Sequence, residues 1–172
     1  AAGIVVSKVG TYPIHRSELL DLWHSYKHSI QSKPLYTKEE MKELVSQWQS
    51  KGETVVFTNG CFDILHRGHI TYLQEAAQLG DHLIIGLNSD SSVQRLKGET
   101  RPIVSEEDRA ALLSALRCID GVVLFEENTP AELLAYLRPN TLVKGGDYKI
   151  EDIIGRESVD NVEVLSFKEG YS

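Results

Sequence analysis

The sequence has few of the residues and none of the long apolar runs that mark disulfide-rich, metal-bound or membrane proteins. Only two of its 172 residues are cysteines, Cys61 and Cys118, and their spacing fits neither a metal site nor a disulfide framework. Both fall in or beside apolar segments, which favours small buried side chains over reactive thiols. Reduced cysteines are typical of a cytoplasmic protein, and we expect that location.

Membrane and nucleic-acid partners are not expected either. No apolar run approaches the roughly 18–20 residues of a membrane span, and no stretch has the pattern of a signal peptide. The formal net charge is −7, from 18 Lys and Arg against 25 Asp and Glu. An acidic chain lacks the basic face that a nucleic-acid backbone requires. A small phosphorylated substrate is still compatible, because it needs only a local basic pocket.

Two common phosphate-binding motifs are absent, namely the G-x-G-x-x-G fingerprint and the Walker loop. A different phosphate site is predicted around Gly60. The apolar run Thr54–Phe57 indicates a buried strand that Gly60 ends, and a helical pattern opens after His69. A strand that turns into a helix collects unpaired N–H groups and the positive end of the helix dipole at one point. His66 and His69 lie at that point, and Gly68 between them permits close approach of a nucleotide.

Strands and helices alternate along the rest of the chain. The strands are predicted at about 54–59, 82–88, 121–125, 141–143 and 162–165. The helices are predicted from a capping box at Thr37 and Glu40 to Lys51, at about 68–79, from an Asp90 cap, from Ser105, and from Pro130 as first helical residue to Leu137. This order predicts an α/β protein with a Rossmann-like, doubly wound parallel sheet. Ligands of such sheets bind beyond the carboxyl ends of the strands, where the strand order reverses.

The helix from Ser105 is predicted to present one apolar face to the core, and Arg109 is expected on its surface. The residues predicted for that face are Ala111, Leu112, Ala115 and Leu116.

The first 36 residues differ from the rest. They start without an initiator Met inside an apolar segment and end in a polar, linker-like stretch. We expect residues 1–36 to be the remnant of a preceding domain plus a linker, and residues 37–172 to be the main domain.

Polar and basic residues at the predicted strand ends form the candidate binding site. Lys97 and Arg101 flank Gly98, and their charges make them candidates for binding phosphate groups. Lys144 follows the fourth strand, where its charge can neutralise phosphate. The residues predicted to bind nucleotide are Thr58, Asn59, Gly60, Cys61, Phe62, Asp63, Gly68, Asn88, Lys144, Gly145, Gly146 and Asp147. Those predicted to bind the second substrate are Asp63, Lys97 and Arg101. A metal site of His66, His69 and Asp63 is possible from spacing alone, but weak, and no metal ligand from protein side chains is expected.

The stretch Gly60–His69 resembles the G-x-F-D-x-x-H-x-G-H motif of the cytidylyltransferase-like nucleotidyltransferases. Four more segments extend the resemblance to the adenylyltransferases that make ADP-heptose from ATP and D-glycero-β-D-manno-heptose 1-phosphate for lipopolysaccharide core biosynthesis. These segments are Gly86–Asp90, Lys97–Ile103, Leu142–Tyr148 and Glu169–Ser172. The resemblance spans residues 37–172. Residues 1–20 are similar to the last helix of the ribokinase-like heptose kinase that precedes this domain in many such proteins.

The resemblance implies an ATP-dependent, Mg²⁺-requiring adenylyltransferase that releases pyrophosphate and forms a homo-oligomer, most simply a dimer. It implies that His66 and His69 contact the triphosphate and stabilise the transition state, with Lys97 as a third catalytic residue. Gly170–Ser172 lies where the family begins a Ser/Thr-rich helix that helps to bind the triphosphate, so this C-terminal element is expected to be truncated.

Two alternatives stay open. One is a cytidylyltransferase that uses CTP and an alcohol phosphate such as glycerol 3-phosphate, because base choice depends on pocket hydrogen bonds. The other is a nucleotide-binding module without turnover.

Overall fold

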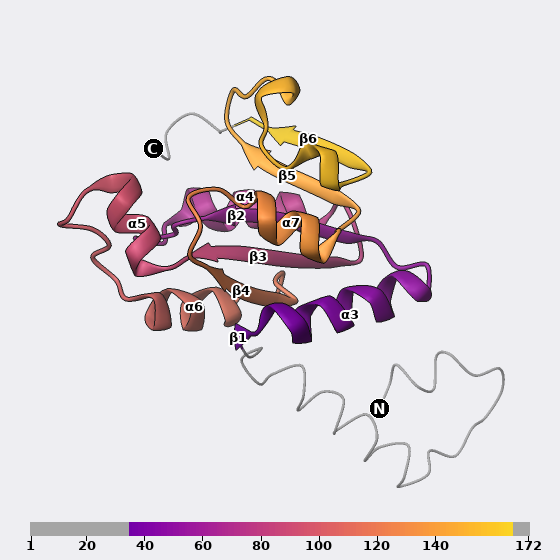
Figure 1. Ribbon diagram of the computed structural model, residues 1–172, viewed down its shortest axis with the longest axis horizontal. Coiled ribbons are helices and arrows are strands. Elements are labelled where there is room, and N and C mark those ends of the chain that lie inside the picture. The colour runs from indigo at the N-terminus through magenta and orange to yellow at the C-terminus, as the bar shows by residue number, and fades with distance from the viewer. Residues whose placement is uncertain (1–34, 167–172) are drawn as a thin grey trace, which may run out of the picture. The chain divides into compact units, whose positions relative to one another are not determined.

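The structure, a computed structural model, describes residues 35–166 (Figure 1). The strands are β1 Leu35–Tyr36, β2 Val55–Gly60, β3 His82–Asn88, β4 Gly121–Phe125, β5 Thr141–Gly145 and β6 Asn161–Leu165. The helices are α3 Lys38–Ser50, α4 Arg67–Ala77, α5 Asp90–Lys97, α6 Glu106–Ser114 and α7 Ala131–Leu137, with 3₁₀ turns η1 Ile150–Asp152 and η2 Arg156–Ser158. The predictions for a kinase-like N-terminal helix and for the C-terminal element lie outside the described residues.

All six strands form one parallel sheet in the order β1-β4-β3-β2-β5-β6, which confirms the Rossmann-like prediction. From β2 the chain moves outward through β3 to β4, and then returns to the other side of β2 with β5 and β6. The strand order therefore reverses at β2, between β3 and β5. The carboxyl ends of β2 and β5, at Gly60 and Gly145, lie at this switch point, where open α/β sheets bind their ligands.

The strand β1 was not predicted. Leu35 pairs with Val122 and Tyr36 with Val123, so the sheet takes in two residues of the stretch that the sequence assigns to a linker. The boundary between the two expected domains stays a prediction.

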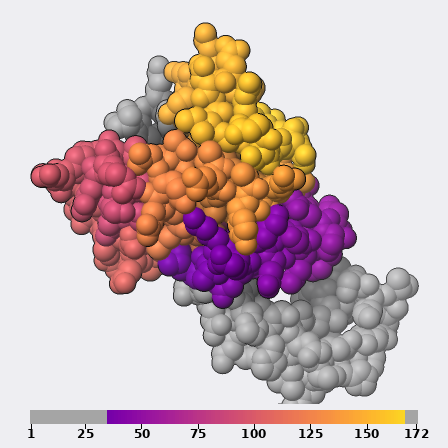
Figure 2. All heavy atoms as spheres, in the orientation of Figure 1, coloured from indigo at the N-terminus to yellow at the C-terminus, as the bar shows by residue number. Residues whose placement is uncertain are grey.

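Helices cover both faces of the sheet, because the central strands are apolar on both sides. Val55 and Phe57 of β2 pack in one cluster with Met41 and Val45 of α3 and with Leu133, Leu134 and Leu137 of α7. Val56 points to the opposite face and packs with Leu73 of α4 and with Ala110 and Leu113 of α6. Figure 2 shows the face that α3 and α7 cover.

Two predictions about helix starts are wrong. Ser89, not Asp90, caps α5, because its hydroxyl accepts the Ser92 N–H. Pro130 is the cap of α7 and not its first helical residue.

The predicted face of α6 is wrong for three of its four residues. Ser105 caps this helix as expected, but Ala111, Leu112 and Ala115 are exposed, and only Leu116, just beyond the helix, packs against the core. The helix is turned so that Ala110 and Leu113 face the core, while Arg109 is buried beside them. Arg109 finds polar acceptors in this orientation, which makes its burial possible.

No helix in the part of the chain that the structure describes is both long and apolar enough to cross a membrane.

The capping box of α3 is confirmed and gives a test of the fold. The Thr37 hydroxyl accepts the Glu40 N–H at 3.2 Å, and the Glu40 carboxylate accepts the Thr37 N–H at 2.9 Å. Thr37→Ala removes one of these acceptors, and we expect it to lower the free energy of unfolding by about 1 kcal/mol. Urea unfolding followed by circular dichroism measures this change.

Ser46→Ala is the matched control within the same helix. The Ser46 hydroxyl only bonds back to the Lys42 carbonyl on the exposed side, and alanine is the better helix former. We expect this variant to be as stable as the wild type or slightly more stable. Equal losses in both variants would contradict a specific role of the cap.

Candidate functional site

The junction between β2 and α4 carries the two histidines. His66 is the N-cap of α4, with an extended backbone (φ −137°, ψ 171°). Its Nδ1 accepts the Gly68 N–H at 3.1 Å. Because this bond occupies the Nδ1 lone pair, the neutral ring carries its proton on Nε2. His66 is therefore held as a donor through Nε2, the form suited to a phosphate oxygen.

His69 lies in the first turn of α4, against the ring of His66. The two imidazole rings are 3.9 Å apart between centroids, and the Phe62 ring meets His69 edge-on at 5.3 Å. Burial lowers the pKa of His69, and the charges of His66 and Lys97 lower it further, against a smaller opposite effect of the Ile64 backbone. His69 is thus neutral at pH 7 without a ligand. A bound anion would favour its protonation.

Asp63 is an internal anchor, only 5% exposed. Its Oδ1 accepts the N–H groups of Ile103 and Val104 at 2.7 and 3.2 Å, and its Oδ2 accepts the Arg101 guanidinium at 2.6 Å. Burial alone would raise the pKa of Asp63, but these hydrogen bonds and the Arg101 charge outweigh it and lower the pKa. Asp63 therefore stays ionised and ties the loop after α5 to the histidine junction. Its contact with nucleotide or substrate stays a prediction.

Two predicted basic residues lie at the end of α5 and in the loop after it. Lys97 ends α5, and its charge acts on both His69 and the Cys61 thiol. Arg101 pairs with Asp63. The predicted catalytic residues His66, His69 and Lys97 thus lie in one electrostatic neighbourhood.

Other predicted residues form the frame of the site. Thr58 is buried, and its hydroxyl shares a 2.7 Å hydrogen bond with Tyr72, which donates to the Val143 carbonyl. Burial raises the pKa of Tyr72 to about 12, so this phenol stays protonated. Asn88 is buried and donates to Ser92.

The Cys61 thiol is half-buried, and burial raises its pKa, so it is a poor nucleophile. Phe62 adopts φ 44°, and its ring lies 3.0 Å from where a Cβ on Gly60 would be. Gly60 therefore leaves room for the ring that contacts His69.

A second cation lies at the end of β5. The Lys144 amine donates to Asn59 Oδ1, and burial lowers the pKa of Lys144 to about 8. Gly145 ends β5, while Gly146 has φ 121°, a conformation that favours glycine. Asp147 is exposed beside them. Asn59 and Lys144 join the carboxyl ends of β2 and β5 at the switch point.

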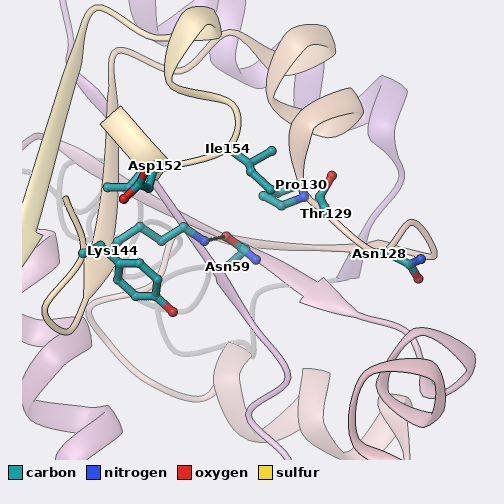
Figure 3. A pocket seen from close by; sticks show the side chains of 9 residues that line it. Asn59, Asn128, Thr129, Pro130, Lys144, Asp152 and Ile154 are labelled. Atoms are coloured by element: carbon teal, nitrogen blue, oxygen red, sulfur yellow. Dashed lines mark hydrogen bonds between the residues drawn. The ribbon is translucent and has the colours of Figure 1, made fainter. Parts of the chain in front are cut away.

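A pocket of about 220 Å³ opens beside this pair. Figure 3 shows the Lys144 side chain reaching toward Asn59, with Asp152 on one side and Thr129 and Pro130 on the other. The pocket is lined by Asn59, Asn128, Thr129, Pro130, Lys144, Tyr148, Asp152, Ile153 and Ile154. Sequence reasoning named only Asn59 and Lys144. The loop after β4 could have been found, since it follows the carboxyl end of a predicted strand.

Arg109 was also missed. It is 1% exposed, and donates to Cys61, Asn88, Asp90 and Val104. The sequence held a signal, because Arg109, Leu113 and Leu116 are spaced i, i+4, i+7 along one helical face.

No group of three or more His, Cys, Asp or Glu side chains among residues 35–166 is arranged to hold a metal ion.

Comparison with known proteins adds to this geometry. The cytidylyltransferase-like family model matches residues 57–169. The bifunctional protein HldE of Wolinella succinogenes is 47% identical over 172 residues, and that of Campylobacter jejuni serotype O:2 is 49% identical. Each match covers all of this chain but 36% of the relative, so the chain spans about a third of the length of these curated proteins.

A solved structure is similar as well. The crystal structure of the lipopolysaccharide core biosynthesis protein from Thermoplasma volcanium is 32% identical, with a TM-score of 0.56. The match covers 68% of this chain and 98% of that one.

The lowered pKa of Lys144 predicts a pH dependence of stability. Between pH 8 and 10.5 the folded chain has released the Lys144 proton while the unfolded chain still holds it, so stability rises with pH in this window. Lys144→Met removes this contribution. We expect the wild type to gain stability relative to Lys144→Met from pH 7 to pH 10.5, measured by urea unfolding at each pH.

Lys51→Met is the control, because Lys51 is an exposed lysine just after α3. Its stability difference from the wild type should stay constant across the same pH range. A constant difference for Lys144→Met as well would contradict the burial of its charge.

Proposed function

Because the chain belongs to the cytidylyltransferase-like family, we propose that it is a nucleotidyltransferase that moves AMP from ATP to D-glycero-β-D-manno-heptose 1-phosphate. The products are ADP-heptose and pyrophosphate, for lipopolysaccharide core biosynthesis. Support comes from the match to proteins named HldE, from the similarity to the lipopolysaccharide core biosynthesis protein of Thermoplasma volcanium, and from the segments that resemble ADP-heptose-forming enzymes. We also propose that the residues before β1, 1–34, belong to the end of a kinase domain and its linker, which fits relatives named as bifunctional.

The observation that carries the proposal is the histidine pair at the switch point. A sugar phosphate oxygen attacks the α-phosphorus of ATP, a new P–O bond forms, and the bond from this phosphorus to the bridging oxygen breaks. Pyrophosphate leaves with the electron pair. No proton needs to move, so positioning and positive or donor groups supply the catalysis. His66 donates through Nε2 to the phosphates, and His69 becomes a stronger donor as the anion favours its protonation.

Lys97 beside His69 and Lys144 at the end of β5 supply charge. Lys97 is close enough to influence the pKa of His69, and Lys144 bonds Asn59 at the end of β2. A lysine with a pKa near 8 is largely protonated at pH 7 but poorly solvated, so a phosphate oxygen is a favourable partner for it. In this proposal Mg²⁺ arrives on the oxygens of ATP as part of the substrate.

We assign the pocket beside Lys144 to the sugar. Its lining offers the Thr129 hydroxyl, the Asp152 carboxylate and the Asn128 amide, groups that hydrogen-bond sugar hydroxyls. Tyr148 is 58% exposed and adds an aromatic ring. A sugar bound here would lie beside Lys144, and in this proposal the Lys144 amine contacts the phosphates.

We further propose that the enzyme acts in the cytoplasm on small molecules, as a homodimer, and without a nucleic-acid or membrane partner. The net charge of −7 supports the absence of a nucleic-acid partner.

The first test of the proposed function is pyrophosphate release with Mg²⁺. ATP with heptose 1-phosphate is compared with CTP and glycerol 3-phosphate. We expect release only in the first mixture. Release only in the second would replace the substrate pair, and no release in either mixture, together with ATP binding, would leave a binding module.

In the active mixture, His66→Ala and His69→Ala should each lower kcat by about 10²–10³-fold, the size of loss seen when a preorganised transition-state donor is removed. His82→Gln is the control. His82 is the first residue of β3 and stacks on Trp48, so it lies at the end of that strand away from the candidate site. Unchanged kcat in both alanine variants would remove the histidines from the mechanism.

The assignment of the sugar pocket predicts a selective loss of affinity. Thr129→Val and Asp152→Asn remove a hydroxyl and a charge at nearly constant shape. We expect each to raise KM for the sugar phosphate by about tenfold, the effect of losing one hydrogen bond to substrate, and to leave KM for ATP within about twofold. An increase confined to KM for ATP would assign the pocket to the nucleotide instead.

A further inference from the structure

Arg109 is a buried cation within the described structure, at 1% exposure, on the helix α6. A guanidinium carries five N–H donors in a planar fork and remains charged at any pH at which proteins fold. Such a group is stable in an interior only where its donors are matched. Its partners therefore show what the burial achieves.

The four partners come from four different segments. Nη1 donates to the Cys61 carbonyl at 2.6 Å and to the Asn88 carbonyl at 2.8 Å, and Nε donates to the Val104 carbonyl at 3.0 Å. Nη2 forms an ion pair with Asp90 Oδ1 at 2.6 Å. One planar group thus fixes the chain after β2, the end of β3, the start of α5 and the loop before α6.

Each of these segments leads to a residue of the candidate site. The chain after Cys61 leads to His66, and the end of β3 leads into the helix that starts at Asp90 and ends at Lys97. The loop that ends at Val104 contains Arg101. Moving any of the four acceptors would change the distance between the histidine pair and the two basic residues.

We infer that Arg109 is a positioning residue for nucleotidyl transfer, which holds the Lys97–Arg101 segment at a fixed distance from His66 and His69 without touching the substrate. The kinetic part of this inference rests on the proposed function. The structural part does not, because it concerns the ligand-free protein.

His69 reports on this distance. Besides burial, the two charges that lower its pKa are those of His66 and Lys97. If the contacts of Arg109 are lost and Lys97 moves away, the pKa of His69 rises. An NMR titration of the histidine ring protons therefore measures the positioning directly.

Two conservative variants are chosen so that the protein still folds. Arg109→Lys keeps the charge, but one ammonium cannot span four acceptors that lie in different directions. Asp90→Asn keeps the guanidinium and an oxygen acceptor, and removes only the charge of a partly exposed carboxylate. For Arg109→Lys we expect kcat per folded molecule to fall by about tenfold or more, as orientation is lost, with KM for ATP within about twofold. Asp90→Asn should show a smaller fall in kcat, again with KM for ATP within about twofold.

Val45→Ala is the stability control, because Val45 lies in the core cluster on the α3 face. Folded fraction is measured by circular dichroism for all variants. The inference would be overturned by two results together. These are a kcat per folded molecule of Arg109→Lys equal to that of Val45→Ala, and an unchanged midpoint of the NMR titration of His69.

Two further outcomes are informative. If Arg109→Lys does not fold, Asp90→Asn alone decides by the same two readouts. If the wild type forms no ADP-heptose, the proposed function fails, and the His69 midpoint of the variants still decides the role of Arg109.

Discussion

Two buried charges of opposite sign hold the active edge of the sheet together. Asp63 accepts hydrogen bonds from the N–H groups and the guanidinium of the loop between α5 and α6, and Arg109 donates to carbonyls at the ends of β2 and β3. Removing one partner of a buried charge costs several kcal/mol, whereas a complete network is near neutral for stability. Such a network contributes more to a single geometry than to stability. The histidine junction depends on that geometry, since its loops have little regular structure of their own.

The architecture of the domain could be predicted from the sequence because it depends on period and order. Apolar runs such as His82–Asn88 and Gly121–Phe125 are strands with the predicted bounds, and the alternation with helices admits one handedness of connection. The capping box at Thr37 was also readable, because it consists of two residues at fixed spacing. The two-residue strand β1 was not, since Leu35 and Tyr36 are too few to show a period.

The polar interior of the site was harder to predict, because its contacts join residues that lie far apart in the sequence. Arg109 bonds Cys61, 48 positions earlier, and Asp63 bonds Ile103, 40 positions later. Helical periodicity treats arginine as a surface residue, so the predicted face of α6 was displaced. The pocket beside Lys144 combines the loop after β4 with η1, two segments that meet only once the sheet is formed. The motif around His66 was readable because its residues are neighbours along the chain.

Burial prepares this acidic chain to bind an anion. The pKa values of His69 and Lys144 are both lowered, chiefly by burial, so the cationic form of each group is poorly solvated. An anion that binds beside either group favours its protonated form, and protonation in turn strengthens the contact. Under the proposed function, binding of a phosphate group would therefore increase the positive charge of the site.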